Sequence, residues 1–326
     1  MIRVGMISFA HMHAHSYAQA VTAFANAELI GISDPDKSRG EETARTYNTL
    51  YESSVDDLLS KVDAVVICSE NAHHKADVLA AAAKGVHVLC EKPLATSVKD
   101  AEEMITACEN AGVILQTAFP VRFNPPVQQL KALIDRGDLG QIRAIHGTNR
   151  GTNPGGWFID PSLSGGGAVL DHTVHVVDLM RWMLQSEVQE VYAEVGQQFG
   201  TTTADDCGLL SFSFQNGTIA TLDPSWSRNR TFPTWGDVTM DVIGSDGMTR
   251  LDAMKQHIML YSDVENAVSQ LSCADNHDIG LMKDFLDSVA ANRQPSITGT
   301  DGLKAMQVAL AAYESFQRKQ PVTIHH

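Results

Sequence analysis

An aspartate and a histidine, Asp171 and His175, stand four residues apart in the segment AVLDHTVHVVDLMRWML. In a helix, this spacing brings both side chains to one face, one turn apart. The carboxylate can then orient the imidazole, and the imidazole can accept the proton of an alcohol while hydride leaves the same carbon. Three glycines precede the pair, and we expect them to let backbone and ligand approach closely. An ion pair on a helix surface is the alternative interpretation.

A lysine, Lys92, directly follows the apolar run VHVLC and stands between Glu91 and Pro93. We expect it at the carboxyl edge of a parallel sheet, where ligands of such sheets bind. Its ammonium group can lie beside a substrate hydroxyl and assist proton transfer. When this motif is considered without the others, Lys92 is more commonly a solvated surface residue than a catalytic one. Together with the helical pair, we predict Lys92, Asp171 and His175 as the catalytic residues.

The first strand-to-helix turn, residues 8–13, reads Ser-Phe-Ala-His-Met-His where dinucleotide-binding folds usually have G-x-G-x-x-G. Ser8 and Ala10 are still small enough for the backbone to approach a pyrophosphate at the helix N-terminus. His13, in contrast, fills a position that is usually bare. Asp34 follows the second strand, where an acid accepts the ribose hydroxyls and favours NAD over NADP. A turn aspartate is the alternative for this residue.

Histidines alternate along the same loop at positions 11, 13 and 15, and we expect His172 and His175 to face them across a cleft. Imidazoles suit zinc, manganese or iron. However, the sequence shows no carboxylate placed to complete such a site. We therefore predict no bound metal and expect the histidines to hydrogen-bond a pyrophosphate.

These residues need a scaffold, and the first 120 or so residues alternate short apolar runs with helical patterns. This alternation is typical of a doubly wound α/β sheet. Later segments, such as DCGLLSFSFQN and DVTMDVIGSDG, indicate an antiparallel sheet that two final helices follow. We predict an α/β protein with a Rossmann domain at residues 1–121 and an α+β domain at residues 122–326, with a cleft between them.

The composition excludes some classes of partner. The 24 Lys and Arg against 39 Asp and Glu give a formal charge of -15, which repels phosphate backbones and anionic membranes. No segment approaches the roughly 18 apolar residues of a membrane span. The N-terminus lacks the pattern of a secretory signal. We therefore expect a cytoplasmic protein that binds neither nucleic acid nor membranes.

Several motifs occur together along the chain: Asp34, SENAHH at residues 69–74, EKP at 91–93, RFNP at 122–125, and W-x-x-D-P-x-x-S-G-G-G-x-x-x-D-x-x-x-H-x-x-D at 157–178. Over essentially its full length the chain resembles the glucose-fructose oxidoreductase / inositol dehydrogenase (GFO/IDH/MocA) family. The resemblance implies a Rossmann domain, bound NAD or NADP, and oxidation or reduction of sugars, inositols or related molecules. It also implies an open-faced sheet that joins subunits into a homodimer or homotetramer.

The predicted site combines the motifs with this resemblance, which places Lys92, Asp171 and His175 around the nicotinamide and the substrate. The predicted cofactor contacts are Ser8, Phe9, Ala10, His11, His13, Asp34, Ser69, Asn71, His74, Glu91 and Lys92. The predicted substrate contacts are Arg122, Arg150, Trp157 and His172. The chain departs from the family at the missing glycines, at Pro120 and at Phe158, which all touch the cofactor or substrate side.

Three functions compete. The first is hydride transfer to NAD, with NADP less favoured, in which Asp171 orients His175 as the base and Lys92 polarises the substrate hydroxyl. The second is a redox-neutral enzyme that uses transient oxidation for elimination or hydrolysis, or else a bound metal. The third is a sugar or nucleotide sensor without catalysis, because a fold can be recruited for binding alone.

Overall fold

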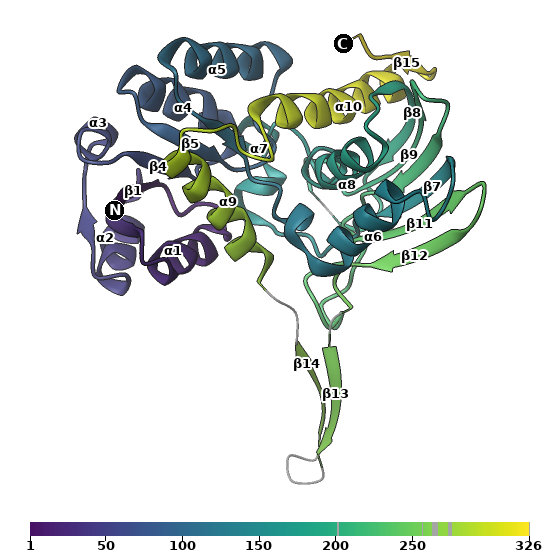
Figure 1. Ribbon diagram of the computed structural model, residues 1–326, viewed down its shortest axis with the longest axis horizontal. Helices are drawn as coiled ribbons and strands as arrows, with labels where there is room; N and C mark the ends of the chain where they lie inside the picture. Colours follow the sequence, from purple (N-terminus) through teal and green to yellow (C-terminus); the bar gives the residue numbers. More distant parts are fainter. Residues whose placement is uncertain (201, 256, 263–266, 273–275, 326) are drawn as a thin grey trace.

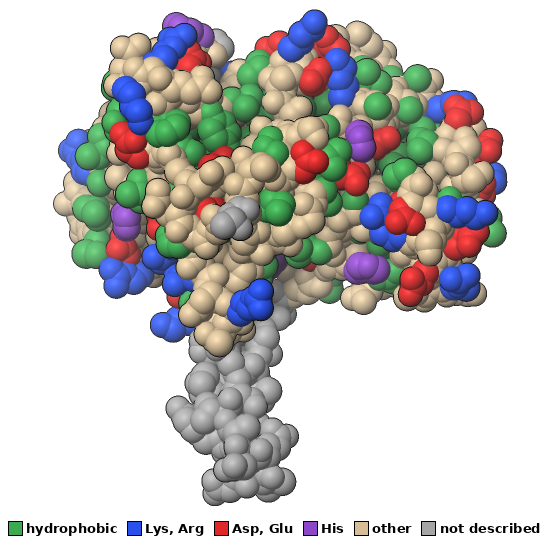
Figure 2. Space-filling view, turned by 180° about the vertical axis from the view of Figure 1, so that it is seen from behind, with side chains coloured by type: hydrophobic (Ala, Val, Ile, Leu, Met, Phe, Trp, Pro, Cys, Tyr) green, Lys and Arg blue, Asp and Glu red, His purple; other side chains and the backbone are tan. Residues whose placement is uncertain are grey.

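The computed structural model describes residues 1–200, 202–255, 257–262, 267–272 and 276–325, and it contains two large β-sheets (Figure 1). The sheets lie side by side, each with its own helices. Among the described residues, no helix has the length and apolar character that crossing a membrane requires. On the face seen in Figure 2, acidic and basic side chains are interspersed.

The first sheet has six parallel strands in the order β3-β2-β1-β4-β5-β6. The strands are β1 Ile2–Ile7, β2 Ala27–Ser33, β3 Leu50–Tyr51, β4 Ala64–Ile67, β5 His87–Cys90 and β6 Leu115–Thr117. The helices are α1 Ala14–Ala23, α2 Lys37–Thr46, α3 Val55–Leu59, α4 His74–Ala83 and α5 Val98–Ala111, with a 3-10 turn at Asn71–His73. Every residue of β4 is buried, as continuous apolar runs predict for strands covered on both faces. The predicted doubly wound sheet is confirmed.

The second sheet has seven strands in the order β12-β11-β7-β10-β9-β8-β15. The strands are β7 Ile142–Thr148, β8 Val188–Gly196, β9 Cys207–Phe214, β10 Ile219–Asp223, β11 Thr239–Gly244, β12 Met248–Asp252 and β15 Val322–Thr323. The sheet is mostly antiparallel, as predicted, although β10 pairs with β7 in parallel. A separate hairpin of β13 His257–Ser262 and β14 Ala267–Ser272 projects away from the body of the molecule (Figure 1).

Helices cover one face of the second sheet, and apolar side chains remain on the other. The covering helices are α6 Pro125–Asp135, α8 Ala168–Leu184 and α10 Gly299–Arg318. Along β9, buried and more exposed residues alternate, as expected for a sheet with one covered face. Leu209, Ile219 and Met248 are each more than 60% exposed. Among the described residues, these apolar side chains on the open face of the sheet therefore remain exposed.

The chain returns to the first sheet near its end. Helix α9 His277–Ala291 packs against α1, and α10 packs against α5 as well as α8. The remaining short segments are α7 Pro161–Ser164 and the 3-10 turns Pro120–Phe123 and Gly156–Ile159. Because α9 and α10 contact elements of the first sheet, the domain boundary after residue 121 stays a prediction for this last part of the chain.

Candidate functional site

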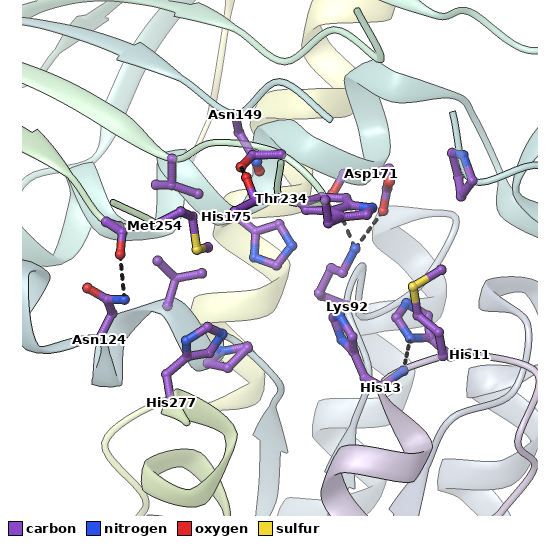
Figure 3. A pocket seen from close by; sticks show the side chains of 18 of the residues that line it. His11, His13, Lys92, Asn124, Asn149, Asp171, His175, Thr234, Met254 and His277 are labelled. Carbon is purple, nitrogen blue, oxygen red and sulfur yellow. Dashed lines mark hydrogen bonds and ion pairs between the residues drawn. The ribbon is translucent and has the colours of Figure 1, made fainter. Parts of the chain in front are cut away.

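A cavity of about 550 Å³ lies where the two sheets meet, which is a size that suits a small ligand (Figure 3). Its lining comes from the first loop, the end of β5, helix α8, the end of β7, the loop before β11 and the start of α9. The polar lining residues are His11, His13, Lys92, Asn124, Asn149, Asp171, His175, Thr234, Asn276 and His277. All three predicted catalytic residues thus border one cavity.

Lys92 and Asp171 form a buried ion pair at the centre of this cavity. The ammonium nitrogen Nζ donates to Oδ1 of Asp171 over 2.5 Å, and the two residues are only 3% and 7% exposed. The indole N–H of Trp226 donates to the other carboxylate oxygen over 3.3 Å, and His172 Nε2 lies 3.2 Å from that oxygen. These contacts fix the carboxylate, which in turn aims the ammonium group of Lys92.

The charge state of Asp171 follows from these neighbours. Burial by itself raises the pKa of a carboxyl group, but Lys92 and His172 outweigh burial and hold the pKa of Asp171 well below its ordinary value. The residue is therefore a carboxylate at neutral pH. Nζ of Lys92 also lies 3.5 Å from the backbone carbonyl oxygen of Asp171, so the lysine is held in a fixed position, and among the described residues one N–H bond remains for a ligand.

His175 lies one turn further along α8, but Asp171 does not orient it. Asp171 directs its carboxylate to Lys92, Trp226 and His172 instead, and Nδ1 of His175 is buried without a hydrogen-bond partner among the described residues. The expectation that Asp171 holds His175 is therefore wrong. Burial, followed by the nearby charge of Lys92, lowers the pKa of His175 well below its ordinary value. The imidazole is neutral at neutral pH and able to accept a proton.

The start of α8 is held by a carboxylate from a distant loop. Asp205 accepts the backbone N–H groups of Gly167 and Val169 over 2.9 and 2.8 Å, and the Tyr313 hydroxyl accepts that of Leu170. A Cβ atom on Gly167 would lie 2.0 Å from the carbonyl oxygen of Asp205. Gly166 and Gly167 therefore allow close packing against Tyr313 and Asp205, and the approach of a ligand at the glycines stays a prediction. This contact sets where α8 begins, and so where Asp171 lies.

The first loop keeps the shape of a dinucleotide-binding turn without its glycines. Ser8 adopts φ 65°, a left-handed conformation that glycine usually supplies at this turn. Helix α1 begins directly after the loop and has no side-chain cap at its N-terminus. An uncapped helix N-terminus attracts a pyrophosphate through its free N–H groups and its dipole. The loop therefore fits a dinucleotide, even though Ser8, Ala10 and His13 replace the three glycines.

Asp34 lies at the end of β2 as predicted, but its carboxylate is already hydrogen-bonded to an arginine side chain. Its two oxygens accept from the backbone N–H groups of Phe9 and Asp36 over 2.8 and 2.9 Å. They also accept from Nε and Nη2 of Arg39 over 2.8 and 2.7 Å. These four donors use the four acceptor positions of a carboxylate. Arg39 thus stands at the position where a ribose hydroxyl or a 2′-phosphate is recognised, a residue that the sequence prediction missed.

Three predicted cofactor contacts make hydrogen bonds within the protein, although Oδ1 of Asn71 is buried without a partner among the described residues. Ser69 donates to Asp77, and Asn71 donates to the carbonyl group of Ser164 over 2.8 Å, which ties the first sheet to the loop before α8. Both ring nitrogens of His74 lie within 3.1 Å of backbone carbonyl oxygens, and the residue is fully buried. His74 has no polar atom left for a cofactor, so we assign it a structural position.

Arg122, a predicted substrate contact, is not at the cavity. Its guanidinium group forms a two-pronged ion pair with Asp178 at 2.5 and 2.7 Å and also contacts Asp301 at 3.1 Å. Arg122 is 4% exposed and Asp178 is fully buried. The motif residue therefore joins the 3-10 turn before α6 to α8 and α10, and it does not reach a substrate.

The other predicted substrate contacts, Arg150, Trp157 and His172, are not among the residues that line the cavity. Arg150 pairs with Asp237 at 3.3 Å, away from the cavity lining. The indole N–H of Trp157 donates to the carbonyl group of Ala10, and its ring stacks on Phe158, which does line the cavity. His172 is fully buried, and its Nδ1 lies 3.0 Å from a backbone carbonyl oxygen. It acts on the site through Asp171.

The structure adds polar lining residues that the sequence prediction missed. Asn149 follows β7, and its side-chain N–H donates to the carbonyl group of Asp237, whereas its Oδ1 is buried without a partner among the described residues. His277 begins α9 and faces the cavity (Figure 3), and Asn276 directly before it also lines the cavity. An asparagine at a strand end was the only signal for Asn149. No signal in the sequence indicated Asn276 and His277, because their place at the cavity depends on the packing of α9 against α1.

A model of an oxidoreductase family with the NAD-binding Rossmann fold matches residues 2–119. A model of the GFO/IDH/MocA C-terminal domain matches residues 127–250. The chain belongs to the GFO/IDH/MocA family. Its first domain is the NAD-binding Rossmann domain of this oxidoreductase family, which confirms the predicted fold and cofactor.

Relatives in the GFO/IDH/MocA family match nearly the whole chain. Myo-inositol 2-dehydrogenase of Thermotoga maritima is 27% identical over 99% of this chain and 98% of that protein. 1,5-Anhydro-D-fructose reductase of Ensifer adhaerens is 29% identical over 91% of each. The solved structure of GenD2 from gentamicin A biosynthesis, in complex with NAD, is 25% identical, covers 100% of this chain and 97% of that chain, and has a TM-score of 0.91.

Proposed function

We propose that this protein transfers hydride between NAD and a CH–OH carbon of a cyclic polyol or sugar. The observation that carries the proposal is the Lys92–Asp171 ion pair beside the neutral imidazole of His175, in a cavity that the first loop of the Rossmann domain borders. Relatives named for inositol and for anhydrofructose support cyclic, hydroxyl-rich substrates. The cavity volume is in the range of small-molecule sites.

Each residue has a separate task in this proposal. Lys92, which Asp171 holds in place, donates a hydrogen bond to the substrate oxygen and stabilises negative charge on it. The neutral imidazole of His175 takes the hydroxyl proton. The unpaired Oδ1 of Asn149 accepts a hydrogen bond from a second hydroxyl group. When bound, the nicotinamide cofactor supplies the hydride acceptor.

The proposal is tested by titrating the full chain with NAD and NADP and following tryptophan fluorescence. Inositols, sugars and glycosides are then screened for absorbance of the reduced nicotinamide. We expect saturable NAD binding and reduction of NAD by at least one polyol. Absence of NAD binding overturns the proposal. Tight binding without net reduction across the panel would instead favour the redox-neutral reaction.

The cofactor preference gives a prediction about Arg39. Replacing Arg39 with Ala removes the cation that neutralises Asp34, so the carboxylate should repel a 2′-phosphate more strongly. We expect the ratio of the dissociation constants for NADP and NAD to rise about tenfold, which corresponds to one lost charge-assisted contact. Arg45→Ala, on the exposed face of the same helix, is the matched control. An unchanged ratio in Arg39→Ala refutes this role.

A pH prediction follows from His175. Because burial lowers its pKa well below the ordinary value, the imidazole stays unprotonated as the pH falls from 7.5 to 6. An ordinary histidine with a pKa of about 6.5 would lose roughly fourfold of its neutral form over this range. We expect kcat/KM for alcohol oxidation to show no such fourfold decline. A decline of kcat/KM at low pH with an apparent pKa near 6.5, present in the wild type and absent in His175→Asn, would contradict the assignment.

We further propose that subunits associate through the open face of the second sheet. Leu209, Ile219 and Met248 are large apolar side chains exposed on β9, β10 and β12, and exposed apolar residues on one open sheet face favour an interface there. A second copy of the chain is the expected partner. Light scattering after size-exclusion chromatography should give a dimer or tetramer, and Leu209→Glu combined with Ile219→Glu should shift it towards the monomer. A wild-type monomer at micromolar concentration would overturn this assignment.

A further inference from the structure

His11 and His13 line the cavity (Figure 3), and the carboxylate of Glu91, which directly follows β5, lies close to both of them. Among the described residues this is the one group whose ligand-forming atoms lie close enough to share a metal ion, all within 4.8 Å of one another. The sequence predicts no metal here, because it shows no carboxylate placed near the histidines. The fold supplies one from a residue 78 positions further along the chain than His13.

The distances in this cluster match those around a single ion. Oε1 of Glu91 lies 2.9 Å from Nδ1 of His13 and 3.7 Å from Nδ1 of His11. Two atoms that are each about 2.1 Å from one metal ion lie roughly 3.0 Å apart at an angle of about 90° and roughly 3.6 Å apart at about 120°. The three side chains therefore need only small shifts to bind one ion.

The buried carboxylate also faces the two imidazoles with one oxygen. Glu91 is fully buried, and its Oε2 accepts the backbone N–H of Lys92 over 3.0 Å, so Oε1 is the oxygen on the side of His11 and His13. Nδ1 of His11 accepts the backbone N–H of His13 over 3.2 Å, and an ion would compete for this lone pair. A buried carboxylate oxygen next to two imidazole nitrogens is an arrangement that a cation stabilises.

We propose that His11, His13 and Glu91 bind one divalent first-row transition metal ion, such as Zn²⁺ or Co²⁺, beside the reaction cavity. Two imidazole nitrogens and one carboxylate oxygen suit these ions, whereas Mg²⁺ and Ca²⁺ prefer oxygen ligands. Three protein ligands leave a fourth position for water or for a hydroxyl oxygen of a bound molecule, because His11 and His13 both line the cavity. The site is additional to the proposed hydride transfer, which needs Lys92 and His175.

Ion binding replaces contacts that the cluster makes without an ion. The hydrogen bond between Nδ1 of His13 and Oε1 of Glu91 is lost. The hydrogen bond that the backbone N–H of His13 donates to Nδ1 of His11 is lost as well. The charged groups next to the cluster are Lys92, Asp171 and Asp278, so charges of both signs surround it.

The test uses the full chain without an affinity tag, treated with a chelator and titrated with Co²⁺ alone. We expect visible absorption bands that saturate at one ion per chain, are abolished by Zn²⁺ and are unaffected by Mg²⁺. His11→Ala and Glu91→Gln should each weaken binding at least tenfold. His15→Ala is the matched control, because His15 continues the same alternation but contacts Tyr47 outside the cluster. It should bind Co²⁺ as the wild type does.

Wild-type protein that shows no saturable Co²⁺ binding overturns the site without recourse to variants. Equal affinity in His11→Ala, Glu91→Gln and the wild type overturns the ligand assignment. Circular dichroism checks that the variants are folded, and an increase of the wild-type Tm with Zn²⁺ that is absent in a folded His11→Gln supports the proposal independently. NAD binding is measured separately by fluorescence, so failure of the metal site is distinguishable from failure of the proposed function.

Discussion

Replacement of Lys92 by Met is expected to lower kcat for polyol oxidation about 10³-fold. The substitution removes the group that holds and polarises the substrate oxygen, and acid–base groups of this kind contribute roughly 10²- to 10⁴-fold. The buried Asp171 keeps Trp226 and His172 as partners, so the site should persist without its cation. The measurement is steady-state kinetics with the best polyol from the substrate screen.

Two comparisons make this result specific. Lys99→Met changes a lysine side chain that is 83% exposed, and it should keep wild-type kcat. NAD binding by Lys92→Met, followed by fluorescence, should stay within a few-fold of the wild type. If Lys92→Met retained more than a tenth of the wild-type kcat, Lys92 would not be catalytic and the proposed mechanism would fail.

Asp178→Ala is expected to destabilise the protein by about 3 kcal/mol or more. Asp178 is fully buried and holds the guanidinium group of Arg122 through two hydrogen bonds. Removing one partner of a buried pair leaves the other charge poorly compensated, which costs about 3–5 kcal/mol. Asp301 continues to contact Arg122, so we place the value at the lower end of this range. Urea unfolding of the wild type and the variant gives the difference.

An exposed ion pair in the same chain gives the control. Arg250 and Asp241 pair across β11 and β12, and the arginine side chain is 75% exposed. Asp241→Ala should cost less than about 1 kcal/mol, as surface pairs do. Replacing both buried partners, in Arg122→Met combined with Asp178→Leu, should recover part of the stability that Asp178→Ala loses. Equal costs for the buried and exposed aspartates would contradict the structural role of Arg122.

The sequence predicts the architecture well because local patterns determine it. Continuous apolar runs in β4 and β5 require a sheet covered on both faces, and alternation in β9 requires a sheet with one covered face. Gly112 follows α5 at φ 68°, as the predicted end of that helix requires. The parallel pairing of β10 with β7 and the packing of α9 on α1 join distant segments, and no local pattern indicates them.

The sequence predicts which residues gather at the site better than it predicts their partners. Spacing correctly indicates that Asp171 and His175 share a helical face, but it cannot show that Lys92 arrives from β5 and takes the carboxylate. The motif containing Arg122 marks a residue of the fold, and its ion pair with Asp178 becomes visible only in three dimensions. The carboxylate of Glu91 beside the histidine loop was missed for the same reason.

The return of α9 to the first sheet has a consequence during synthesis. The Ser16 hydroxyl donates to Asp278 over 2.5 Å, so α1 gains a neighbour that lies 262 residues further along the chain. A Rossmann domain that folds as it leaves the ribosome must wait with one side of α1 uncovered until α9 has been made. His277 joins the lining of the cavity in the same step. The nascent chain therefore cannot form its finished binding site before α9 has been translated.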